Sequence, residues 1–105
     1  MVNSRIIGVG HFLPKKIMKN SDLRKIVDTS EEWITSRTGI DQRHIASKGE
    51  LTSALATSAA KEAIKSANIK SSSIDCIILA TTTPDETFPS TASIVQKNLD
   101  IGSTP

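Results

Sequence analysis

The sequence predicts an α/β fold in which helices pack in layers on a mixed or parallel β-sheet. Strand and helix signals alternate along the chain, and residues 51–67 have the periodicity of an amphipathic helix. Residues 76–80 form a short apolar run without alternation, which is typical of a central strand covered on both faces.

The N-terminal half is expected to contain a strand and two short helices. Residues 5–10 are β-prone and end in glycines, so a strand followed by a loop is predicted there. Apolar side chains recur at helical spacing in residues 20–27, after an Asn-Ser-Asp capping signal. Thr29 and Glu32 have the spacing of a capping box, which predicts a second helix that ends at Gly39.

The C-terminal half is expected to contain the longest helix and a last helix that begins at Pro89-Ser90. Residues 42–46 precede the long helix as a short strand or extended edge, and residues 71–73 follow it as a loop. The long helix divides into a buried half (Leu55, Ala56, Ala59, Ala60, Ala63, Ile64 and Ala67) and a polar half (Thr57, Ser58, Lys61, Glu62, Lys65 and Asn68). In the last helix, the side chains expected to face inward are Ala92, Val95 and Leu99.

Length and charge restrict the class of protein. The 105 residues suffice for one domain, and a scattered net charge of +2 argues against nucleic acid or a membrane surface as partner. No leader or membrane-spanning segment is recognisable, so a cytoplasmic protein is expected. The strand at 76–80 needs neighbours that the chain does not supply, and residues 1–105 are therefore interpreted as the opening part of a larger domain.

Few residues suggest catalysis or metal binding. His11 and His44 lie far apart and outside any metal-spaced cluster, which favours surface or structural roles. Cys76 is the only cysteine, so a disulfide framework and a thiolate zinc site are excluded. Within an apolar strand its thiol would be buried and inert, and we interpret it as a core residue. No metal site or resident cofactor is predicted.

Residues 28–40 suggest a ligand site. Thr29, Trp33 and Arg37 have i, i+4, i+8 spacing and would share one face of a continuous helix. A planar base can stack between an indole and a guanidinium, and the guanidinium can also pair with phosphate. These properties suit the nucleotide end of coenzyme A. On spacing alone, a capped helix whose Trp covers the core is the more economical explanation.

The same segment resembles the N-terminal signature of β-ketoacyl-acyl-carrier-protein synthase III, the condensing enzyme that starts bacterial type II fatty acid synthesis. The resemblance continues in register through residues 6–8, 13–14, 28–29, 32–34, 37–40, 43–46, 80–84 and 88–90. It implies a thiolase-like fold with α/β/α layers. Residues 1–105 would be the first portion of its N-terminal half, and the C-terminal half would be absent.

The resemblance implies roles for particular residues. Trp33 and Arg37 match positions that sandwich the adenine of coenzyme A in this family, and Thr29 matches a residue of the same nucleotide site. Phe88 matches an aromatic residue that reaches across a dimer interface to close the partner's acyl pocket. Thr82 matches a residue near that interface.

The family activity is the expected function of the full-length parent. A homodimer would condense acetyl-CoA, or another short acyl-CoA, with malonyl-acyl carrier protein. In the family a Cys takes the acetyl group as a thioester, and a His and an Asn assist the decarboxylation that generates the attacking carbanion. All three residues would lie beyond Pro105, so no catalytic residue is assigned and residues 1–105 alone are expected to be inactive.

Two alternatives remain open at the level of sequence. The chain could come from another thiolase-fold enzyme that condenses or transfers acyl groups from acyl-CoA. It could also be a small non-catalytic α/β binding module that is complete as it stands, against which the unfinished sheet counts.

Overall fold

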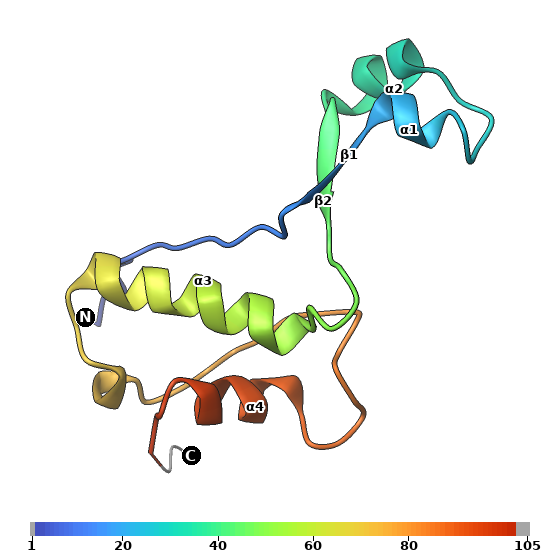
Figure 1. The fold of residues 1–105 in the computed structure, drawn as a ribbon. Helices are drawn as coiled ribbons and strands as arrows, with labels where there is room; N and C mark the ends of the chain where they lie inside the picture. Colours follow the sequence, from blue (N-terminus) through green and yellow to red (C-terminus); the bar gives the residue numbers. More distant parts are fainter. Residues whose placement is uncertain (1, 103–105) are drawn as a thin grey trace. The chain divides into compact units, whose positions relative to one another are not determined.

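The structure is a computed structural model that describes residues 2–102. The chain divides into two compact units (Figure 1). One comprises Leu13–Gly49, and the other combines Met1–Phe12 with Glu50–Pro105.

The unit Leu13–Gly49 contains a two-stranded antiparallel sheet and two helices. Its elements are β1 (Lys16–Lys19), α1 (Asn20–Leu23), α2 (Glu31–Thr38) and β2 (Gln42–Ile45). Lys16 pairs with Ile45 and Lys19 with Gln42. β2 confirms the strand expected at 42–46. No strand was predicted at β1. Its four residues have no clear strand pattern in the sequence and form a strand through pairing with β2.

Both helices of this unit differ from the sequence-based boundaries. α1 ends at Leu23 instead of residue 27, and a turn with i→i−3 hydrogen bonds follows it. α2 is capped by Ser30, whose Oγ accepts the N–H of Trp33 at 3.1 Å, so the predicted capping by Thr29 is wrong. Gly39 ends α2 in the left-handed conformation (φ 67°), as predicted.

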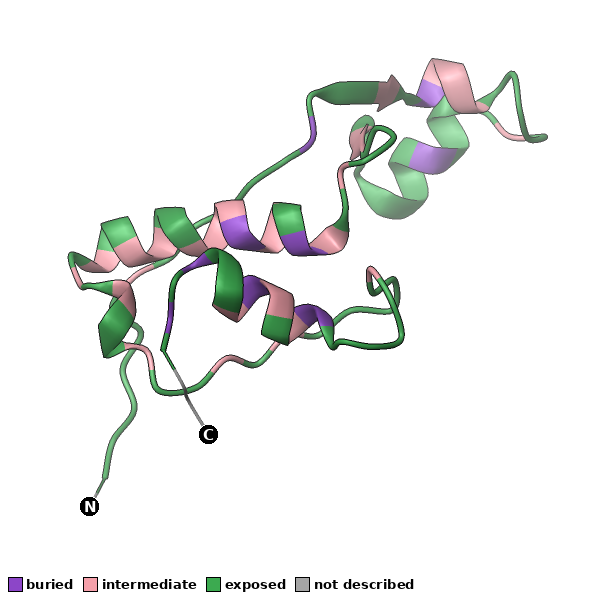
Figure 2. Ribbon diagram, turned by 60° about the horizontal axis from the view of Figure 1, so that its bottom comes forward, coloured by how far each residue is buried: buried purple, intermediate pink, exposed green. Residues whose placement is uncertain are grey.

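The second unit is built around the long helix α3. Its elements are α3 (Thr52–Ala67), a 3₁₀ turn (Ser71–Ser73) and α4 (Thr91–Asn98). α3 and α4 confirm the two predicted helices, and Ser90 caps α4. The buried core consists of Val95, Leu99 and Ile101; the apolar side chains packed against it are Ala56, Ala60, Ile64, Ile74, Ile77 and Leu79. Figure 2 shows the buried and half-buried positions on the facing sides of α3 and α4.

α3 buries two polar residues. Thr57 was assigned to the polar half of the helix, but it is buried and its Oγ1 accepts a hydrogen bond from Asn98 Nδ2 at 3.2 Å. That assignment was wrong because α4 packs at this point. Ser53 is also buried, and its backbone N–H donates to Asp85 Oδ1 at 2.9 Å. Asp85 therefore caps α3 from a distant loop, since the N-cap residue Leu51 provides no side-chain acceptor.

Strands were predicted for this unit at residues 5–10 and 76–80, but neither segment forms a ladder with any described residue, so both strand predictions are wrong. In residues 74–79, Ile77 and Leu79 are half-buried against the helices, whereas Cys76 and Ile78 are exposed. The predictions of a strand covered on both faces and of a buried Cys76 are therefore wrong. α3 and α4 cover one side of this segment, and no described residue covers the other.

The glycines near the N-terminus lie directly against α3. A Cβ at Gly8 would stand 2.5 Å from the carbonyl oxygen of Ala63, and one at Gly10 would clash with the backbone of Ala59 and Ala63. The N–H of Val9 donates to Ser66 Oγ at 3.5 Å. The small alanine side chains of α3 thus permit a close approach between its backbone and that of the N-terminal segment.

Replacing Gly10 by alanine is expected to lower the free energy of unfolding by about 1–3 kcal/mol, because the new methyl group would overlap the α3 backbone. Chemical denaturation measures the change. Gly102→Ala is the matched control, since a Cβ there meets nothing within 4 Å. Equal stability of Gly10→Ala and Gly102→Ala would contradict the close contact.

Replacing Asp85 by alanine is expected to cost about 1 kcal/mol of stability, the usual effect of losing a helix-capping acceptor. Asp85→Asn keeps an acceptor oxygen and should therefore retain most of the stability that the cap provides. Glu86→Ala, an exposed carboxylate one residue away, provides the control in thermal denaturation. A loss of the same size in Glu86→Ala would argue against a specific capping role.

Candidate functional site: an aromatic and basic face of helix α2

Trp33 and Arg37 lie one turn apart on α2, as their spacing predicted. The Arg37 Cζ atom stands 5.7 Å from the centroid of the Trp33 ring, within the range of a cation–π contact. Trp33 remains 57% exposed instead of covering the core. α2 therefore presents an accessible aromatic surface with a positive charge above it.

A cavity of about 360 Å³ adjoins the indole and is lined by Asp28, Thr29, Ser30 and Trp33. Thr29 reaches this cavity from the loop that precedes α2, because the helix begins only at Glu31. The structure thus brings Thr29 and Trp33 together, although they do not share a helix face as predicted. Arg37 does not line the cavity.

The spacing of the two flat groups limits how a base can bind. A ring held between indole and guanidinium needs about 7 Å between them, because each face-to-face contact spans about 3.5 Å. The observed 5.7 Å is shorter. The Arg37 side chain must therefore swing outward before a base fits between it and Trp33.

The opposite side of α2 is held by a polar network centred on Asn20, which is only 3% exposed. Asn20 Nδ2 donates to Ile40 O at 2.7 Å and to Thr35 Oγ1 at 3.2 Å, and its Oδ1 accepts from Arg43 at 2.7 Å. Thr35 Oγ1 in turn donates to Asp41 Oδ1 at 3.1 Å. Sequence reasoning used Asn20 only as a helix-capping signal and missed this role, since its partners lie 15 to 23 residues away.

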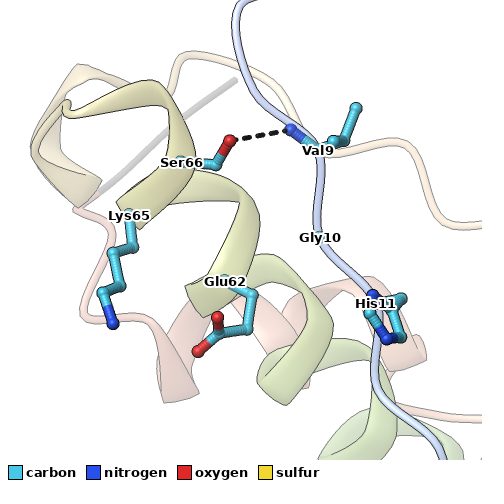
Figure 3. Close-up of a pocket in the computed structure, with 6 residues that line it drawn as sticks. All are labelled: Val9, Gly10, His11, Glu62, Lys65 and Ser66. Atoms are coloured by element: carbon cyan, nitrogen blue, oxygen red, sulfur yellow. Dashed lines mark hydrogen bonds between the residues drawn. The ribbon is translucent and has the colours of Figure 1, made fainter.

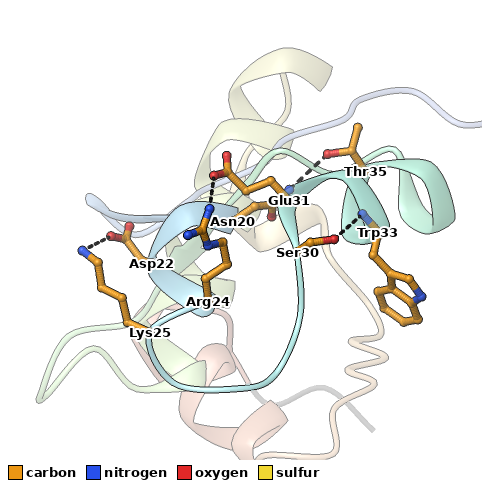
Figure 4. Close-up of polar contacts among 8 residues, drawn as sticks. All are labelled: Asn20, Asp22, Arg24, Lys25, Ser30, Glu31, Trp33 and Thr35. Atoms are coloured by element: carbon orange, nitrogen blue, oxygen red, sulfur yellow. Dashed lines mark hydrogen bonds and ion pairs between the residues drawn. The ribbon is translucent and has the colours of Figure 1, made fainter.

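Charged groups surround the entry into α1 and α2 (Figure 4). The Lys19 backbone N–H donates to Asp22 Oδ2 at 3.0 Å, and this bond lowers the pKa of Asp22; slight desolvation opposes the shift and the charge of Lys25 reinforces it. Arg24 and Glu31 form an exposed ion pair at 3.7 Å that joins the end of α1 to the start of α2. An exposed pair of this kind adds little stability.

The other residues singled out by the resemblance lie in the segment between residue 80 and α4. Thr82 is exposed, and the Phe88 side chain is 84% exposed. A large exposed aromatic side chain is available for contact with another surface.

A further cavity, of about 380 Å³, lies between the N-terminal segment and α3 (Figure 3). It is lined by Val9, Gly10, His11, Glu62, Lys65 and Ser66. Residues 2–102 contain no group of three His, Cys, Asp or Glu side chains that could hold a metal ion. His44 donates from Nδ1 to the carbonyl of Pro14, which is a structural role. No helix in the same range has the length and apolarity that crossing a membrane requires.

Comparison with known proteins relates both sequence and backbone to one group of enzymes. No protein-family model matches the chain. The chain is 56% identical over 99 residues to the β-ketoacyl-[acyl-carrier-protein] synthase III of Thiobacillus denitrificans. The aligned segment covers 94% of this chain and 31% of that protein. The crystal structure of the 3-oxoacyl-[acyl-carrier-protein] synthase III of Aquifex aeolicus superposes with a TM-score of 0.91 at 52% identity, over 97% of this chain and 33% of that one.

A more distant similarity joins the chain to the priming β-ketosynthase of the R1128 polyketide pathway, with a TM-score of 0.89 at 28% identity over 96% of this chain and 30% of that one. The chain thus spans about a third of the length of the proteins that it matches. Its helices and small sheet are consistent with part of a thiolase-like α/β fold. The resemblance found in the sequence is confirmed: this chain is homologous to a third of a β-ketoacyl-[acyl-carrier-protein] synthase III.

Proposed function

We propose that the full-length protein condenses acetyl-CoA, or another short acyl-CoA, with malonyl-acyl carrier protein, and that residues 1–105 contribute the nucleotide end of its coenzyme A site. The observation that carries this proposal is the accessible Trp33 indole with Arg37 above it, next to the cavity at Asp28–Ser30. The similarity to β-ketoacyl-[acyl-carrier-protein] synthases III supports it.

In this proposal each residue of the site has a distinct task. Trp33 offers one flat face to the adenine, and Arg37 swings outward to flank the base or to pair with a phosphate. Thr29 contributes a hydroxyl from the cavity wall. Bond formation belongs to Cys, His and Asn residues outside residues 1–105, and Cys76 takes no part.

We further propose that the protein works as a cytoplasmic homodimer. Phe88 would reach the acyl pocket of the partner subunit, with Thr82 near the same interface. The high exposure of Phe88 leaves its ring available for such a contact, which supports this assignment.

The second candidate is another thiolase-fold enzyme that condenses or transfers acyl groups from acyl-CoA. The backbone similarity to the priming β-ketosynthase favours it. Its 28% identity, against 56% for the β-ketoacyl-[acyl-carrier-protein] synthase III of Thiobacillus denitrificans, makes it the weaker candidate. Comparing turnover of acetyl-CoA with that of longer acyl-CoA substrates separates the two.

Substitutions at the indole and guanidinium test the coenzyme A site. Trp33→Ala in the full-length protein should weaken coenzyme A binding by about 1–3 kcal/mol, the range for losing one base stack. Arg37→Lys keeps the charge but loses the flat face, so it should weaken binding almost as much as Arg37→Ala if stacking dominates. Rescue by lysine would show that the charge alone matters.

Calorimetric titration with coenzyme A measures these affinities. Arg24→Ala removes another exposed arginine of the same unit and is the matched control. Unchanged affinity in Trp33→Ala would refute the proposed site and leave α2 as a purely structural helix.

The purified 105-residue chain is expected to show no condensing activity with acetyl-CoA and malonyl-acyl carrier protein. Cys76 is exposed, but within residues 2–102 no hydrogen bond joins its thiol to a base that could activate it as a nucleophile. Product formation above that of a Cys76→Ser variant would contradict this expectation.

A further inference from the structure

The two sides of α2 have different chemistry. Successive residues of an α-helix are rotated by about 100°, so Trp33 and Arg37 lie within about 40° of each other and Thr35 lies on the opposite side. Figure 4 shows the Trp33 indole projecting away from Thr35 and Asn20. One side of the helix thus carries the proposed ligand face, and the other is hydrogen-bonded to the body of the unit.

Apolar packing does little to define the orientation of α2. Ile34 is its only buried residue, and the helix has just eight residues. The groups that hold its inner side are therefore mainly polar: Thr35 Oγ1 accepts from Asn20 and donates to Asp41. The Asn20 amide uses both of its N–H groups, and its oxygen accepts a charge-assisted bond from Arg43 on β2.

We infer that Asn20 and Thr35 are positioning residues of the coenzyme A site: the buried amide and the threonine hydroxyl set the rotation of α2 about its axis and thereby the direction of Trp33 and Arg37. This inference rests on the proposed function. Neither residue touches the ligand in this arrangement. Thr35 lies on the inner side of α2, and Asn20 holds it there through the hydrogen bond between them.

Helix geometry indicates how sensitive the site is to this contact. With an outer radius of about 5–6 Å, a 20° rotation of α2 displaces an outward-pointing ring by about 2 Å. A displacement of that size takes the indole out of face-to-face contact with a bound base, since stacked rings require close, nearly parallel approach.

Thr35→Val in the full-length protein is the direct test. Valine keeps the branched shape of threonine but removes both hydrogen bonds to Asn20 and Asp41. We expect the dissociation constant for coenzyme A to rise at least fivefold in calorimetric titration, with an unchanged fitted number of sites. A role confined to stability would lower the number of sites and leave the dissociation constant of the folded molecules unchanged.

Two variants serve as controls. Thr35→Ser restores the hydroxyl without the methyl group and should bind coenzyme A within about twofold of the parent protein. Thr38→Val removes a hydroxyl from the same helix, but its bonds reach only Ile34 and Ile40, so its dissociation constant should also stay within twofold. Equal weakening by Thr35→Val and Thr35→Ser would overturn the inference, because the hydroxyl would then not be the determinant.

The outcome for Trp33→Ala separates this inference from the proposed function. If Trp33→Ala abolishes stacking while Thr35→Val binds like the parent, the coenzyme A site stands and the positioning role fails. If Trp33→Ala leaves the affinity unchanged, the site itself fails. Should Thr35→Val not fold, Asn20→Ser is measured in the same way, and an unchanged dissociation constant overturns the positioning role.

Discussion

The small side chains of α3 are the constraint on which its whole unit depends. Alanines along the helix let the backbone at Gly8 and Gly10 approach so closely that no Cβ fits between them. On another side, α3 accepts the apolar residues of α4 and of the segment from Ile74 to Leu79. Its N-terminus is capped from a distance by Asp85. Larger side chains at Ala59 or Ala63 would push the N-terminal segment away from α3, and larger ones at Ala56 or Ala60 would disturb the packing of the core.

The layer packed on α3 and α4 is covered on one side only. In the segment 74–79 half-buried residues face the helices, while Ile78 is 93% exposed and Cys76 is accessible. An apolar run without alternation predicted cover on both sides. Exposed apolar residues at this segment and at the N-terminus therefore mark surfaces suited to further packing, which agrees with homology to only a third of a larger synthase.

The two sides of α2 differ in chemistry. Its outer side carries an exposed indole beneath a guanidinium, and its inner side is held by hydrogen bonds more than by apolar contacts. Polar contacts are directional and short, so they define rotation more sharply than a few apolar contacts can. This property suits the role proposed for α2, in which its outward side chains meet the flat base of coenzyme A.

The sequence by itself determined features that depend on neighbours within a few residues: the extent of α3, the left-handed end of α2 at Gly39, and the alignment of Trp33 with Arg37. Its motifs also identified the homologous enzymes. Tertiary structure alone decided the burial of Thr57 by a partner 41 residues away, the pairing that makes β1 a strand, and the three partners of Asn20. Local periodicity reports which side of a helix is apolar. It does not report which distant polar group lies across from a given hydroxyl or amide, because that depends on the tertiary packing of segments far apart in the sequence.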